Sequence, residues 1–371
     1  MAKTPERKFV QTTLNLFPEQ RNNNLSSSHQ ASSLQFRRAD VSPSNGQSEP
    51  EAKIPREDEM EDVQPTSSSN MKAIPPAKAA IQARRANLSA IAKETTSLLP
   101  NILATAPHAP PKGYLYAPPN PPRLHPRYCP NIPRTAIRIL DADTFDTAIG
   151  LANCARYITF RDNKPVCVLN MANAENAGGG WKRGALAQEE ALCYRSSLSF
   201  SLKLRYYPIP EFGAIYSPSV LVIRESMEDG HGLLDLSQPD KLPVVSVVTV
   251  AALCFPKVDM VLEGEGESRK VRELYADPND RETMKEKMRV VLRTAAVNGH
   301  RRLVLGALGC GAFLNPREEV ADCWAEVFEE REFGGGWWES VLFAVMDDKG
   351  EGENGSGNFG VFFRRLNGMM V

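Results

Sequence analysis

The tripeptide Gln188-Glu189-Glu190 begins at the eighth residue after a run of glycines, Gly178–Gly180. Glycines let the backbone adopt positive φ and approach a ligand closely. Neighbouring carboxyl groups suit general acid and base chemistry. They equally suit the positive end of a helix dipole, so an ordinary glycine loop before an acidic first turn is the competing interpretation. The triplet Gly334–Gly336 has no acid pair after it, and we expect it to be a plain loop.

A second glycine-spaced turn follows an apolar run. Residues 303–308 predict a buried strand, Gly309 and Gly311 predict the turn, and a helix begins at Pro316. A strand, a glycine turn and a helix start form the arrangement in which backbone N–H groups hold phosphates. The spacing is neither that of a P-loop nor that of a dinucleotide fingerprint. Phe313 stands at the tip of this turn, where it would pack on a sugar or cap the core.

Strands and helices alternate around these two segments. Apolar runs predict strands at 135–140, 166–171, 214–224, 244–253, 303–308 and 340–346. Helical spacing predicts helices at 144–156, 189–204, 281–298 and 316–330, the last with Asn315 as its cap. The charged stretch 257–280 predicts a loop. This alternation indicates an α/β fold with a mixed, mostly parallel sheet, in which ligands bind beyond the carboxyl ends of the strands.

The chain before the strands falls into two parts. Residues 1–76 are rich in Ser, Asn, Gln, Pro and charge, a composition that predicts a disordered tail. Residues 77–133 contain a helix over 78–99, which we expect to stop at Pro100, and then a proline-rich segment that we expect to be extended rather than regular. The catalytic domain would then span residues 134–371.

The composition excludes several function classes. The chain has 44 basic and 45 acidic side chains and a net charge of −1, which excludes a generically basic nucleic-acid binder. No apolar run is long enough to span a membrane, so we expect no membrane partner. The seven cysteines form no C-x-x-C pair and the five histidines form no cluster. We therefore expect no metal site, no disulfide framework, no cofactor and a reducing compartment.

Taken together, the two glycine segments resemble the poly(ADP-ribose) glycohydrolase family. Residues 178–190 match its signature of three glycines, a short spacer and Gln-Glu-Glu, although Ala177 stands where the microbial-type branch usually has proline. Residues 306–316 resemble the diphosphate loop of that branch, and residues 88–95 its accessory helix. The resemblance extends from about residue 80 to the C-terminus. It implies a macrodomain-like fold, a three-layer α/β/α sandwich that binds ADP-ribose.

The resemblance also implies roles for individual residues. Glu190 would be the catalytic residue, Glu189 would contact ribose hydroxyls, and Asn173 would position the ribose or the acid-bearing loop. Phe313 would pack on the reacting ribose. The remaining residues implied in substrate binding are Gly178, Gly179, Gly180, Gln188, Gly309, Cys310, Gly311 and Ala312.

The implied reaction is hydrolysis of the O-glycosidic ribose–ribose bonds of poly(ADP-ribose). Ordinary glycosidases place one carboxyl on each side of the bond. Adjacent Glu189 and Glu190 cannot easily do so, and we expect Glu190 alone to act first as acid and then as base. Two alternatives stay open: an enzyme that removes terminal or protein-linked mono-ADP-ribose, and a non-catalytic ADP-ribose-binding macrodomain. Retention of both acids argues against the second.

The tail holds one unusual island. Gln11, Leu14 and Phe17 resemble the box by which proteins dock on the replication sliding clamp, although Pro18 replaces its second aromatic residue. An idle tail is the competing interpretation. Besides this clamp, we expect ADP-ribosylated proteins and poly(ADP-ribose) as partners, a monomer, nuclear or cytoplasmic localisation, and a role in the DNA damage response.

Overall fold

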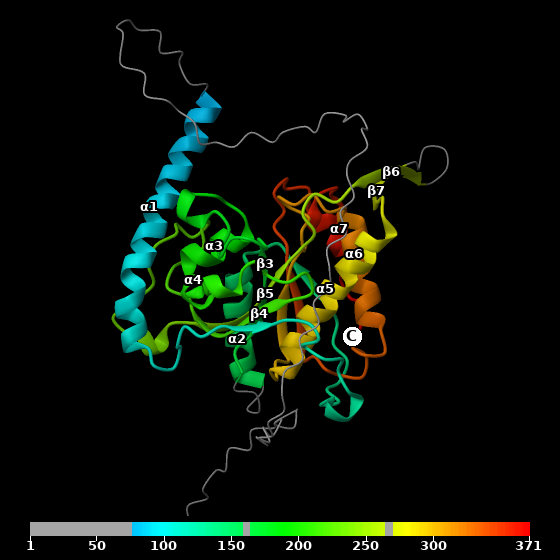
Figure 1. The fold of residues 1–371 in the computed structure, drawn as a ribbon, viewed down its shortest axis with the longest axis horizontal. Coiled ribbons are helices and arrows are strands. Elements are labelled where there is room, and N and C mark those ends of the chain that lie inside the picture. The colour runs from blue at the N-terminus through cyan, green and yellow to red at the C-terminus, as the bar shows by residue number, and fades with distance from the viewer. Residues whose placement is uncertain (1–75, 159–163, 264–269) are drawn as a thin grey trace, which may run out of the picture. The chain divides into compact units, whose positions relative to one another are not determined.

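A mixed seven-stranded sheet lies at the centre of the molecule (Figure 1). The structure is a computed structural model that describes residues 76–158, 164–263 and 270–371. In sheet order the strands are β1 (Tyr114–Tyr116), β4 (Ala214–Leu221), β5 (Val244–Ala251), β3 (Cys167–Ala172), β8 (Arg302–Leu305), β9 (Ser340–Ala344) and β2 (Arg138–Leu140). Neighbouring strands run parallel from β5 to β2, whereas β4 pairs antiparallel with β5 and β1 pairs antiparallel with β4. The expected mixed, mostly parallel sheet is confirmed.

Helices cover both faces of this sheet. The helices are α1 (Pro76–Thr105), α2 (Thr144–Ile158), α3 (Gln188–Arg195), α4 (Leu198–Ser201), α5 (Pro278–Val297), α6 (Arg317–Glu329) and α7 (Asn358–Leu366). Alternate side chains of β3 enter different cores. Leu169 packs with α5, α6 and α7, whereas Val168 packs with α1, α2 and α3. The expected three-layer α/β/α sandwich is therefore confirmed.

The first helix does not stop where we predicted. α1 continues through Pro100 to Thr105. Its second half is held by packing, because Leu99 and Ile102 are buried in one cluster with Leu242. A proline inside a helix costs about 3 kcal/mol through its missing N–H group and its steric clash. Burial of apolar side chains on both sides of Pro100 outweighs that cost.

The loop predicted over 257–280 is also wrong. The chain forms an antiparallel hairpin of β6 (Val258–Glu263) and β7 (Lys270–Tyr275) before α5 begins at Pro278. Charged and apolar residues are mixed in these strands, so the charge obscured the strand pattern. An ion pair between Arg272 and Glu263, at 3.2 Å, joins the two strands. Figure 1 shows the hairpin at the edge of the molecule that carries α6.

The helix predicted over 189–204 is interrupted after Arg195. Ser196 has extended backbone angles and pairs with Val222, and the N–H group of Ser197 donates to the carbonyl of Leu221 at 2.9 Å. Serine side chains compete for backbone hydrogen bonds and so favour such breaks. The short helix α4 follows, and no single helix spans the predicted range.

Two further elements lie where we predicted none. The proline-rich segment contributes β1, whose three residues pair with β4, so this segment is not wholly irregular. Helix α7 forms near the C-terminus and buries Phe359 and Phe362. No helix in the described ranges is long and apolar enough to cross a membrane.

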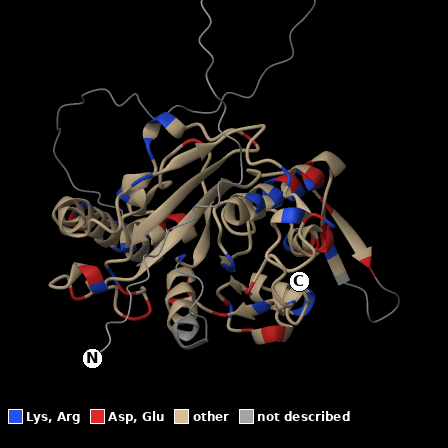
Figure 2. Cartoon of the chain, turned by 90° about the horizontal axis from the view of Figure 1, so that it is seen from below, with Lys and Arg blue, Asp and Glu red and all other residues tan. Residues whose placement is uncertain are grey.

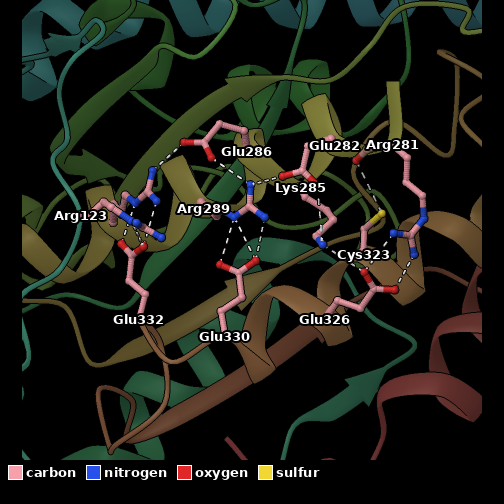
Figure 3. A network of polar contacts seen from close by, with 11 residues as sticks. Arg123, Arg281, Glu282, Lys285, Glu286, Arg289, Cys323, Glu326, Glu330 and Glu332 are labelled. Carbon is pink, nitrogen blue, oxygen red and sulfur yellow. Dashed lines mark hydrogen bonds and ion pairs between the residues drawn. The ribbon is translucent and has the colours of Figure 1, made fainter. Parts of the chain in front are cut away.

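An ion-pair ladder joins α5 to the end of α6. Figure 2 shows basic and acidic segments side by side on these helices, and Figure 3 shows the ladder itself. Its pairs are Arg281–Glu326, Lys285–Glu326, Arg289–Glu330 and Arg293–Glu332. Glu332 also accepts the N–H group of Leu124 at 2.9 Å, which ties the proline-rich segment to the ladder. The four cations of the ladder are therefore each paired with a glutamate of the protein.

Candidate active site

The loop between β3 and α3, residues 173–187, carries the first glycine segment; we call it the acid loop. Asn173 closes its first turn, because its Oδ1 accepts the N–H groups of Glu175 and Asn176, both at 2.8 Å. Asparagine favours such turns. Gly178 and Gly179 then adopt φ values of +75° and +59°. Side chains rarely tolerate these conformations, so the glycines are required by the backbone path.

Both glutamates point back into this loop. Glu190 Oε1 accepts the N–H group of Gly180 at 2.8 Å, and Glu189 Oε2 accepts the N–H group of Asn173 at 2.7 Å. A Cβ atom on Gly179 would lie 2.4 Å from Glu190 Oε1 and 3.1 Å from Glu189 Oε2. The two carboxyl groups therefore lie close to one point, which only a glycine leaves free. Both side chains are buried.

Gln188 fixes the start of α3 against β3. Its Oε1 accepts the N–H group of Met171 at 3.0 Å, and its Nε2 donates to the carbonyl of Leu169 at 2.7 Å. The side-chain amide of Gln188 is thus engaged at both ends by β3. The residue lines the cavity described below, but its bonds hold the two glutamates in place.

Asn170 lies beneath the acid pair, and sequence reasoning did not single it out. It is fully buried in β3, and its Nδ2 contacts Glu189 Oε1 at 3.5 Å and Thr249 Oγ1 at 3.2 Å. Its Oδ1 has no partner among the described residues. A polar residue at the centre of an apolar strand was the available signal. The side chain joins β3 and β5 to the acid pair.

Burial changes the protonation of the acid pair. Burial is the largest cause of a rise in the pKa of Glu189 from its ordinary value of 4.5 to about 8; the charge of Glu190 contributes to this rise, and hydrogen bonds from Asn173 and Asn170 oppose it. Glu189 therefore holds a proton at neutral pH, so the site contains the protonated carboxyl group that an acid catalyst requires.

The second glycine segment, residues 306–315, forms the facing loop. The N–H groups of Gly311, Ala312 and Phe313 have no acceptor within the described part of the chain. The N–H group of Cys310 differs, because it donates to the carbonyl of Ala307 at 3.1 Å. Consecutive free N–H groups form an anion-binding concavity. The expected phosphate-type loop is thus present, with its free donors at 311–313.

Asn315 holds this facing loop in shape. Its Nδ2 donates to the carbonyls of Leu253 at 2.8 Å and Gly309 at 3.1 Å, and its Oδ1 accepts the hydroxyl of Tyr275 at 2.9 Å. We predicted Asn315 as a helix cap, and this is wrong because Pro316 occupies the cap position of α6. The hydrogen bond from Tyr275 depends on the β6–β7 hairpin, which we did not predict from the sequence.

The two loops line one cavity of about 170 Å³, beyond the carboxyl ends of β3, β5 and β8. Its lining contains these predicted site residues: Asn173, Gly179, Gly180, Gln188, Glu189, Glu190, Gly309, Gly311, Ala312 and Phe313. Gly178 and Cys310 lie outside the lining. Gly178 instead packs against Trp181 and Cys193. Two larger hollows, one beside β2 and one beside the α5–α6 ion pairs, contain no residue of either loop.

Comparisons with known proteins agree with this geometry. Residues 105–225, which include the acid loop, match the family model for the microbial-type PARG catalytic domain. The solved poly(ADP-ribose) glycohydrolase (PARG) of Thermomonospora curvata is 26% identical, with a TM-score of 0.55 over 76% of this chain and 99% of that chain. The Deinococcus radiodurans PARG in complex with ADP-ribose is 27% identical, with a TM-score of 0.51 over 72% and 97%. No curated protein matches the sequence.

The chain thus resembles microbial-type PARG in sequence over residues 105–225, and its fold matches a solved PARG over 76% of its length. The family model includes the acid loop and ends before the facing loop. The rim of the cleft carries Phe313, whose ring contacts that of Phe255 at a centroid distance of 6.4 Å. The N–H group of Phe255 donates to the carbonyl of Phe313 at 3.1 Å, which fixes the tip of the facing loop.

The described residues offer no group of three His, Cys, Asp or Glu side chains with the arrangement of a metal site. The polar groups of this PARG-type cleft are instead two carboxyls on one wall and backbone N–H groups on the other. Such a cleft can bind an anion at one wall and exchange a proton with a ligand at the other.

Proposed function

We propose that this chain hydrolyses the O-glycosidic ribose–ribose bonds of poly(ADP-ribose) and releases ADP-ribose. One observation carries the proposal: the Glu189–Glu190 pair and the free N–H groups of residues 311–313 line the same cavity. Solved PARG structures support it, since one holds ADP-ribose and another the inhibitor ADP-HPD. Oriented N–H groups bind a diphosphate without the basic field that this nearly neutral chain lacks.

Glu190 supplies the acid and then the base. With the diphosphate on the facing loop, the reacting ribose lies between this loop and the acid pair. The proton of the pair passes through Glu190 to the departing ribose oxygen as the bond from that oxygen to the anomeric carbon breaks. The resulting carboxylate then takes a proton from water, and the hydroxide adds to the anomeric carbon. The next turnover begins with the proton back on the pair.

The other residues orient these partners. Glu189 contacts the hydroxyls of the reacting ribose, and its raised pKa keeps a proton within the pair. The side chain of Asn173 is engaged within its own turn, so it positions the acid loop rather than the ribose. Phe313 at the rim packs on the reacting ribose.

Replacement of Glu190 tests the proposal. The Glu190→Gln variant should lose at least a hundredfold in the rate of ADP-ribose release from poly(ADP-ribosyl)ated protein, because general acid–base catalysis contributes about 10²–10⁴-fold. Glu175→Gln is the matched control, since Glu175 is an exposed acid in the same loop. Near wild-type release by Glu190→Gln would refute the proposal. Binding of ADP-ribose without turnover by the wild type would instead establish a non-catalytic reader.

Product analysis separates the two hydrolase activities. Release of ADP-ribose from chains, with the protein-linked unit left in place, is the expected result. Release of the last unit from mono-modified protein would establish the alternative activity.

We also propose the wider role that the sequence suggested: a monomer that reverses ADP-ribosylation in the DNA damage response, in the nucleus or the cytoplasm. The clamp-like box at Gln11–Phe17 lies outside the described residues. Calorimetry with a peptide of residues 5–20 tests it, and an absence of clamp binding would end that part of the proposal.

A further inference from the structure

A cluster of exposed cations borders the acid loop. Arg84 and Arg85 of α1 and Lys182 and Arg183 of the 3₁₀ turn η2 (Trp181–Arg183) are exposed. None of them forms an ion pair or side-chain hydrogen bond with a described residue. We call these four residues the α1–η2 basic cluster. It contrasts with the α5–α6 ladder, where each cation contacts one or more glutamates (Figure 3).

Close packing brings α1 and η2 together. A Cβ atom on Gly184 would lie 2.0 Å from the carbonyl oxygen of Arg85, so the backbones touch at this point. Ser89 Oγ donates to the carbonyl of Lys182 at 2.9 Å. Figure 1 shows α1 alongside α3, whose first turn carries the acids. The contacts between α1 and η2 therefore place the two pairs of cations next to each other.

The helical spacing turns the two arginines toward η2. Leu88 is the first buried residue of α1, and the buried stripe continues at Ala92 and Thr95. Arg84 and Arg85 precede Leu88 by four and three residues, so they lie on the same side of the helix. The helix carries no acid before Glu94, which is paired with Arg224 at 2.6 Å. The positive charge of this end of α1 is thus uncompensated.

The cluster adjoins the wall of the cleft that carries the acid pair, because η2 directly follows Gly180, which lines the cavity. In the proposed reaction, the diphosphate of the cleaved unit contacts the facing loop, and the scissile bond faces Glu190 on the opposite wall. The remainder of a chain leaves past the acid loop, and Gly180, whose N–H group binds Glu190, immediately precedes η2. Each further ADP-ribose unit carries a diphosphate.

We propose that the α1–η2 basic cluster binds the diphosphate of the ADP-ribose units that follow the scissile bond. This inference rests on the proposed function and adds a polymer subsite to it. The subsite favours poly(ADP-ribose) chains over short substrates, because exposed cations bind phosphates by counterion release and this attraction weakens with salt.

Steady-state kinetics with two substrates test the subsite. One substrate is poly(ADP-ribose), and the other is ADP-ribose with an aryl leaving group on the distal ribose, which lacks a second diphosphate. For Arg84→Ala/Arg85→Ala and Lys182→Ala/Arg183→Ala, the KM for the polymer should rise about tenfold at low salt. The slope of log KM against log salt should fall by about one for each phosphate that the variant no longer neutralises. The kcat and KM for the aryl substrate should not change.

A matched control removes the same charge elsewhere. Lys112→Ala/Arg138→Ala takes away two exposed cations outside the cluster and should leave both substrates unaffected. Equal losses on both substrates would overturn the subsite and indicate a displaced acid loop. An unchanged polymer KM, with lost binding of single-stranded DNA, would overturn it in favour of a nucleic-acid surface. A wild type that turns over neither substrate would refute the proposed function instead.

Discussion

The carboxyl group of Glu190 lies so close to Gly179 that a side chain at position 179 would collide with it: a Cβ on Gly179 would lie 2.4 Å from Glu190 Oε1. The same atom would lie 3.1 Å from Glu189 Oε2. The glycine therefore lets both carboxyls turn toward the backbone of the acid loop. This close approach explains why glycines and adjacent acids belong together in the signature.

The variant Gly179→Ala should keep the fold and lose activity. The new methyl displaces the Glu190 carboxyl, and misplacement by about 1 Å costs about a hundredfold in rate. Positive φ at this position adds strain of about 1–2 kcal/mol. Gly150→Ala is the control, because nothing lies within 4 Å of its Cβ position. Activity and thermal melting of both variants check the prediction, and a fully active Gly179→Ala enzyme would contradict it.

Asn170 should act as a positioning residue for Glu189. Its amide joins Thr249 on β5 to Glu189 Oε1, so Asn170→Ala removes the support beneath the acid pair. We expect kcat to fall about tenfold or more and the alkaline limb of the pH profile to shift. Ser246→Ala is the control. It removes a buried hydroxyl of β5 that donates to the carbonyl of Pro218, away from the acid pair, and it should leave the pH profile unchanged. Identical pH profiles for Asn170→Ala and the wild type would refute this role.

The acid loop and the facing loop could be found from the sequence because both depend on local features. Glycines at positive φ, an acid pair at a helix start and an apolar strand before each loop are all visible in short segments. The mostly parallel direction of the strands could be predicted because strands and helices alternate along the chain.

The supports of the site could not be found in this way, because they depend on contacts between distant segments. Tyr275 reaches Asn315 only through the β6–β7 hairpin, whose charged residues indicated a loop. The continuation of α1 through Pro100 depends on packing against Leu242. Local preference for a helix cap or a helix stop is worth about 1–3 kcal/mol, and tertiary packing overrides it.

The raised pKa of Glu189 makes stability depend on pH. Between pH 4.5 and about pH 8, Glu189 holds a proton in the folded protein and releases it in the unfolded chain. This contribution is fully present below 4.5 and is lost as pH rises through 8. Glu189→Gln should therefore become more stable than the wild type at pH 9, by about 2–5 kcal/mol, and urea unfolding at pH 5, 7 and 9 checks this. The activity of the wild type should fall above about pH 8, and equal stability of both proteins across this range would contradict the prediction.

The link from Tyr275 to Asn315 predicts a selective effect on substrate binding. Asn315→Ala frees the carbonyls of Gly309 and Leu253 and loosens the facing loop, while the acid loop keeps its own bonds. The KM should therefore rise about tenfold, with a smaller change in kcat, since the loop binds ground state and transition state alike. Tyr275→Phe removes one hydrogen bond of about 1 kcal/mol and should give the same pattern with a smaller rise. Steady-state kinetics and calorimetry of ADP-ribose binding on both variants measure this effect. A loss confined to kcat would contradict the prediction, because it would mean that the facing loop positions the reacting ribose against Glu190 rather than holding the diphosphate.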